Sequence, residues 1–162
     1  MSTATEYDKQ PPRDVISAVA FVAVIMAISL GIGYVTAPGE WYDNLDKPAF
    51  NPPSWVFGPV WTVLYVLIAV AVWRMWRVAP RSGAMALWVV QMILNWLWSP
   101  AFFGAEAPAL ALAIIVAMLA LIALFIAQAW RLDRWSAMLF VPYAAWVAFA
   151  TTLNGSIFLL NQ

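Results

Sequence analysis

The residues of this 162-residue chain that could do chemistry are tryptophans, tyrosines and amides, because the sequence has no histidine and no cysteine. Without thiols and imidazoles there are no disulfides, no Ser-His-Asp arrangement and no usual zinc or haem ligands. We therefore predict no metal site. A ligand would be held by aromatic surface, amides and hydroxyls, and the chain has eleven tryptophans for that purpose.

One stripe of such residues lies within residues 84–103. Trp88, Gln91, Asn95, Trp98 and Phe102 follow one another at steps of three or four residues, which places them on one face of a helix. Amides that face lipid would lack partners, so this face is expected to point into a helix bundle. The two amides are compatible with a binding site and equally with hydrogen bonds that hold helices together.

Two further segments carry aromatic and polar residues at helical spacing. Trp61 and Tyr65 are one turn apart, and Tyr143 is followed by Trp146 and, on nearly the same face, by Asn154. If the three stripes converge, they form an apolar pocket with a few orienting polar groups, which is the usual composition of a small-molecule site. A flat aromatic ligand would stack against such walls.

The elements that position these residues are membrane helices. The chain is 65% hydrophobic and 10% charged, whereas soluble domains have about 25% charged residues. Crossing a bilayer takes about 20 apolar residues of helix, and the alternation typical of membrane barrel strands is absent. We predict an all-α integral membrane protein, a five-transmembrane-helix bundle. It comprises a polar tail (1–14) and a membrane domain (15–162) with spans at about 15–35, 56–76, 84–103, 107–130 and 135–159.

The basic residues predict the orientation of the bundle. With five spans, seven basic residues fall on one face and only Lys47 falls on the other. By the positive-inside rule the N-terminus is cytoplasmic and the 36–57 loop is outside. The first apolar run is too long for the core of a cleaved signal peptide, so we expect an uncleaved first helix. Tryptophans beside the cytoplasmic arginines fit an interfacial belt: Trp73, Trp76, Trp130 and Trp135.

The loop at residues 36–57 has the composition of a shaped lid. Its prolines restrict their own φ angles and bias the preceding residues to extended conformations. The loop is therefore expected to be stiff, and its first half cannot be a continuous helix. We predict that the stretch from Trp41 to Phe57 covers a site, although Trp41 and Trp55 fit an interfacial belt equally well. In the span before it, small residues four apart, Ala27/Gly31 and Ser29/Gly33, are compatible with close packing between helices or protomers.

Three blocks in this order resemble the TspO/MBR family of tryptophan-rich sensory proteins, which includes the mitochondrial translocator protein. They are WYDNLDKPAFNPPSWVFGPVWTVLY from Trp41, QMILNWLWSPAFFG from Gln91 and VPYAAWVAFATTLN ending at Asn154. The resemblance implies a five-helix bundle that dimerises and binds porphyrins beneath the loop between the first two helices. It implies that Trp61, Trp146, Asn95 and Trp98 line the pocket, with Tyr65 and Gln91 close by, and that Trp41, Pro52, Pro53 and Trp55 form the lid. The stripe on the fifth segment adds Tyr143 to the candidate ligand-binding residues.

These features favour a membrane receptor or sensor that binds porphyrins such as protoporphyrin IX, with porphyrin as ligand and no obligatory cofactor. One alternative implied by the resemblance is light-dependent degradation of protoporphyrin IX, in which Trp61 and Trp146 would be the catalytic residues. Another is transport of porphyrin or sterol. The expected partners are a hydrophobic small molecule, membrane lipid and a second copy of the chain, with no nucleic acid. The absence of a sorting signal favours a bacterial inner membrane.

Overall fold

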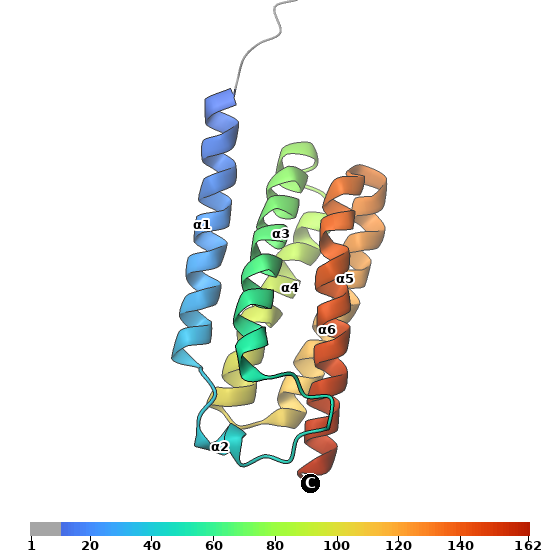
Figure 1. Cartoon of the computed structure of the whole chain (residues 1–162). Helices are drawn as coiled ribbons and strands as arrows, with labels where there is room; N and C mark the ends of the chain where they lie inside the picture. The colour runs from blue at the N-terminus through green and yellow to red at the C-terminus, as the bar shows by residue number, and fades with distance from the viewer. Residues whose placement is uncertain (1–10) are drawn as a thin grey trace, which may run out of the picture.

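Five long apolar helices make up most of the protein. The computed structural model describes residues 11–162, and within that range five helices are long and apolar enough to cross a membrane (Figure 1). The prediction of an all-α, five-span membrane bundle is confirmed. The polar tail predicted for residues 1–14 lies outside the described residues up to Gln10, and the first helix begins at Pro11. The long helices are α1 (Pro11–Val35), α3 (Phe57–Val78), α4 (Gly83–Ser99), α5 (Pro108–Leu132) and α6 (Arg134–Leu160).

Short elements join the long helices at one end of the bundle. A one-turn helix α2 (Glu40–Asp43) and a 3-10 turn η1 (Ser54–Val56) interrupt the loop between α1 and α3. Helix α4 continues into a π-helical turn η2 (Pro100–Gly104), in which the amide of Ala105 donates to the carbonyl of Pro100 at 2.8 Å. Because Pro100 has no N–H to donate to the preceding turn, the regular ladder is interrupted there.

The helix ends follow local sequence signals. Ser82 is the N-cap of α4 and its hydroxyl accepts from the amide of Met85, while Asp133 caps α6 in the same way through Ser136. Pro108 lies in the first turn of α5, where a missing N–H costs nothing. The connections between α3 and α4 and between α5 and α6 are short, and these consecutive helices run antiparallel (Figure 1).

The larger hydrophobic cluster includes the half of the bundle away from the loop, where α3 packs against α5 and α6 through fully buried side chains such as Val72, Met75, Phe125 and Phe140. A second, smaller cluster of buried residues lies near the loop. Helix α1 is the outermost helix, lies beside α3 and makes fewer contacts with α4 (Figure 1). Space remains beneath the loop, where the end of α1 and the start of α3 line one cavity.

Candidate ligand-binding site

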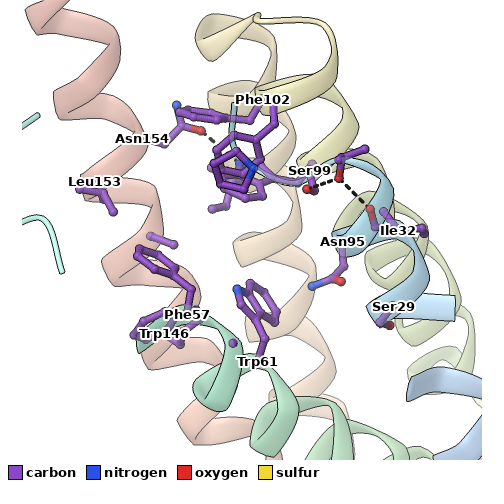
Figure 2. Close-up of a pocket in the computed structure, with 18 of the residues that line it drawn as sticks. Ser29, Ile32, Phe57, Trp61, Asn95, Ser99, Phe102, Trp146, Leu153 and Asn154 are labelled. Atoms are coloured by element: carbon purple, nitrogen blue, oxygen red, sulfur yellow. Dashed lines mark hydrogen bonds between the residues drawn. The ribbon is translucent and has the colours of Figure 1, made fainter. Parts of the chain in front are cut away.

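A cavity of about 480 Å³ lies beneath the 36–57 loop. It is bounded by α1, α3, α4, η2, α5 and α6, and its walls bring together residues as distant in sequence as Ser29 and Asn154 (Figure 2). Its volume falls within the roughly 300–1,000 Å³ of small-molecule sites. All three segments with aromatic and polar stripes contribute to this one cavity.

Aromatic rings form most of the cavity walls. Trp61 stacks on Tyr65 with ring centroids 5.2 Å apart and planes at 26°, and Trp98 stacks on Phe102 at 5.3 Å and 22°. Both pairs are four residues apart, which places the rings above one another on a helix. Trp146 of α6 meets Phe57 edge to face at 5.8 Å and faces the cavity beside Trp61 (Figure 2).

A chain of four buried hydrogen-bonding groups runs from the cavity into the bundle. The hydroxyl of Tyr65 donates to Oδ1 of Asn95 at 3.0 Å, and Nδ2 of Asn95 donates to the hydroxyl of Tyr143 at 2.9 Å. That hydroxyl in turn donates to Oε1 of Gln91 at 2.9 Å. Tyr65 and Asn95 line the cavity, whereas Tyr143 and Gln91 are fully buried and lie outside its lining. The stripe on α4 thus both forms the site and holds helices together.

The indole of Trp98 is fixed by a second amide. Its Nε1 donates to Oδ1 of Asn154 at 3.1 Å, and Nδ2 of Asn154 donates to the carbonyl of Pro108 at 3.0 Å. Asn154 therefore joins α4, α6 and the start of α5, and it lines the cavity itself (Figure 2). This linkage sets the plane of one aromatic wall.

Helix α1 and Thr36, the residue that follows it, supply polar contacts that the sequence patterns did not identify. Nε1 of Trp96 donates to Oγ of Ser29 at 3.0 Å, and the hydroxyls of Thr36 and Ser99 lie 2.6 Å apart in a hydrogen bond. Ser29, Thr36 and Ser99 all line the cavity. The spacing of Ser29 and Gly33 was a signal for this face, but it suggested close packing. A Cβ placed on Gly33 would meet nothing within 4 Å, so within this chain no other helix packs closely on this glycine.

The predicted lid residues divide between roof, support and surface. Pro52 and Phe57 line the cavity, and Phe57 is the first residue of α3 rather than part of the loop. Trp41 packs edge to face on Phe102 at 5.8 Å, below the loop and outside the cavity lining. Trp55 is 74% exposed, and Pro53 precedes η1; neither lines the cavity. Proline and aromatic content alone did not distinguish these positions.

The loop is held to the bundle at its middle. The amide of Asp46 donates to Oδ1 of Asn161 at 3.0 Å, and Nδ2 of Asn161 donates back to the carbonyl of Asp46 at 2.9 Å. Nearer α1, Tyr42 contacts Phe103 edge to face at 5.3 Å, and its hydroxyl donates to Asn51 at 3.4 Å. Burial raises the pKa of the Tyr42 hydroxyl, so it stays a neutral donor. The C-terminal end of α6 thus positions the roof.

The site suits binding of an apolar, aromatic ligand better than acid–base chemistry. No Asp or Glu lines it, and within the described residues no group of three or more acidic residues lies together as a metal site would require. Nε1 of Trp61 and Nε1 of Trp146 make no hydrogen bond in the described part of the chain and remain available as donors. An aromatic cavity with a few donors binds flat molecules with acceptor groups at their edge.

The fold and the cavity together define a five-span helical membrane protein with a ligand-sized aromatic cavity roofed by the loop between its first two spans. The family model described as "TspO/MBR family" matches residues 18–160. The chain belongs to the TspO/MBR family, and the resemblance seen in its three sequence blocks is confirmed.

Individual relatives cover most of the chain. It is 42% identical over 129 residues to the tryptophan-rich sensory protein of Cereibacter sphaeroides, covering 80% of this chain and 82% of that one. It is 35% identical over 152 residues to the tryptophan-rich protein TspO of Archaeoglobus fulgidus, covering 91% and 99%. It is 35% identical over 139 residues to the human translocator protein, covering 80% and 82%. The relatives' names are those of sensory and translocator proteins.

Proposed function

We propose that the protein is a membrane receptor or sensor that binds porphyrins in the cavity beneath the 36–57 loop. The observation that carries this proposal is the convergence of Trp61, Trp98 and Trp146 from three helices on one cavity of about 480 Å³. A porphyrin is flat, conjugated and largely apolar, so its ring gains stacking and burial against these walls. Its carboxylate edge would meet the donors of the site, among them Nε1 of Trp61.

Titration with protoporphyrin IX tests the binding. We expect saturable quenching of tryptophan fluorescence, and Trp61→Leu and Trp146→Leu should each weaken binding by about 2- to 12-fold, since an aromatic pair contributes about 0.5–1.5 kcal/mol. Trp55→Leu is the matched control, because Trp55 is 74% exposed and outside the cavity. Unsaturable quenching, or equal losses in all three variants, would contradict the proposal.

Light-dependent degradation of the bound porphyrin is the second candidate. The observation that favours it is the stacking of Trp61 on Tyr65 at 5.2 Å and its edge contact with Tyr143 at 6.3 Å, which surrounds one cavity indole with oxidisable phenols. In this candidate the porphyrin is its own photosensitiser. Illumination of the saturated complex should then give a new absorbing product that Trp61→Phe and Trp146→Phe abolish. Saturable binding without product supports the receptor alone, and counterflow in proteoliposomes would be the sign of transport.

The orientation and assembly are part of the same proposal. Described arginines gather at the end of the bundle opposite the loop, which supports a cytoplasmic N-terminus and an outer-facing roof. We place the protein in a bacterial inner membrane as a homodimer, on the strength of its resemblance to bacterial members of its family. Labelling of a single cysteine introduced at Trp55 with a membrane-impermeant reagent in intact cells tests the outer position of the loop.

A further inference from the structure

The end of the bundle opposite the loop carries a concentration of positive charge. Among residues 15–162, whose side chains the structure describes, five arginines lie there against one acid, Asp133, whereas the loop end holds four acids against one lysine. In Figure 1 the end of α3 and the junction of α5 with α6 lie at this far end. The arginines are Arg74, Arg77, Arg81, Arg131 and Arg134.

Asp133, the one acid at this end among residues 15–162, is already engaged. Both carboxylate oxygens of Asp133 accept from Arg74, from Nε and from Nη2, each at 2.9 Å. The hydroxyl of Ser136 donates to the same carboxylate at 2.6 Å. The guanidinium of Arg74 therefore holds the pKa of the Asp133 carboxyl below its usual range, and the acid stays paired.

This pairing leaves two arginines beside Asp133 without an acidic partner. Arg131 and Arg134 flank Asp133 in the sequence WRLDRW, and among the described side chains neither makes an ion pair. Both are exposed. Each is next to an exposed indole, Trp130 at 47% and Trp135 at 63%. The corner between α5 and α6 thus presents two free guanidinium groups between two tryptophans.

We propose that this α5–α6 corner binds the headgroup of an anionic phospholipid. A guanidinium group presents paired donors that match two oxygens of a phosphate, and Arg131 and Arg134 have these donors free. Indoles settle at the level of the glycerol and carbonyl groups, so Trp130 and Trp135 would contact the lipid just below its phosphate. The Arg74–Asp133 pair supports the site by keeping the carboxylate away from both arginines.

This site is separate from the cavity. None of the residues of the corner lines the cavity. The loop that covers the cavity contacts the C-terminal end of α6, whereas the corner lies at its N-terminal end. The lipid site is therefore independent of the proposed porphyrin binding, and failure of one leaves the other standing.

The test compares lipid retention by the full-length protein in micelles that contain phosphatidylglycerol and phosphatidylcholine. Native mass spectrometry gives the ratio of the two lipids bound. A basic residue near an anionic surface contributes about 1 kcal/mol, so Arg131→Gln/Arg134→Gln should reduce the preference for phosphatidylglycerol by about thirtyfold. Arg81→Gln is the matched control, because it removes an exposed arginine on the same face that has no neighbouring tryptophan.

Each outcome bears on the proposal. Loss of preference in the double variant with retention in Arg81→Gln supports a defined site. A loss of about fivefold in Arg81→Gln, in proportion to the one charge that it removes, shows a diffuse effect of charge and overturns it, as does a wild-type protein without preference. If the double variant does not fold, Arg131→Lys/Arg134→Lys keeps the charge without the paired donors, and an undiminished preference there refutes headgroup recognition by guanidinium. Full displacement of the lipid by free glycerol phosphate would show that the indoles contribute nothing and would also overturn it.

Discussion

Replacing Tyr143 by phenylalanine removes a single oxygen from the centre of the buried hydrogen-bond chain. That oxygen accepts from Nδ2 of Asn95 and donates to Oε1 of Gln91, both at 2.9 Å. Tyr143 and Gln91 are fully buried, so no water replaces the lost partner of the Gln91 oxygen. The ring contacts with Phe140 and Trp61 persist, because Phe keeps the same ring.

The expected cost follows from the two groups left unpaired. Hydrogen bonds within membrane proteins average about 0.6 kcal/mol, which for two bonds sets a lower limit near 1 kcal/mol. A buried polar group without a partner costs about 1–3 kcal/mol, so two groups that relax in part set an upper limit near 4 kcal/mol. We therefore expect Tyr143→Phe to lower the free energy of unfolding by about 1–4 kcal/mol.

Unfolding in mixed micelles, followed by circular dichroism as denaturing detergent is added, measures this difference. Tyr34→Phe is the matched control, because Tyr34 is 87% exposed and makes no hydrogen bond in the described part of the chain. Gln91→Leu should cost less in the Tyr143→Phe background than in the wild type, because its partner is already gone. The idea that this hydrogen-bond chain stabilises the fold would be refuted if Tyr143→Phe were as stable as Tyr34→Phe. Additive effects of Tyr143→Phe and Gln91→Leu would refute it too.

Three further predictions concern the roof, the cavity and the charged end. Asn161→Ala removes the two hydrogen bonds to Asp46, so backbone amide hydrogen exchange in residues 40–57 should become about tenfold faster while the helices stay protected. Unchanged exchange would show that these two hydrogen bonds do not hold the loop to the bundle. Gly33→Leu places a side chain in open space, so it should leave the stability of the protein unchanged but weaken protoporphyrin IX binding. Unchanged binding in this variant would show that the ligand does not contact the α1 wall of the cavity. Because Arg74 lowers the folded-state pKa of Asp133, the stabilisation from this pair is fully present above the unfolded-state pKa of about 4 and is lost as the pH falls through the lower folded-state value. Asp133→Asn should therefore flatten the decline of unfolding free energy in acid, and an identical decline in both proteins would assign it to other groups.

Helical spacing in the sequence predicted part of the cavity lining. The spacing of Asn95 and Trp98 on one helix face, and of Trp61 and Tyr65 on another, placed four residues that line the cavity. The same reasoning did not separate Asn95 from Gln91, although one faces the cavity and the other is buried behind it. Helical periodicity indicates which face of its helix a side chain lies on. Whether that side chain reaches a cavity or is buried behind it depends on how the neighbouring helices pack against that face.

The loop shows the opposite limit. Its prolines and aromatic residues indicated a stiff cover, but Trp55 is exposed and Trp41 supports the loop from below. Loop side chains have no repeating geometry from which to assign a face. The contact that positions the loop, between Asp46 and Asn161, joins residues 115 positions apart, and no local pattern predicts it.

The sequence by itself determined the membrane setting, the number of spans and the chemical character of the site. Hydrophobic length, the placement of arginines and the absence of histidine and cysteine are properties of composition and order, and they act without reference to the final packing. Only the tertiary structure decided that the cavity extends to α1 and to the residue after it, where Ser29 and Thr36 form hydrogen bonds with α4, and that Gly33 faces open space. The reason is physical: a cavity is space that several helices leave between them, and its shape depends on how those helices pack.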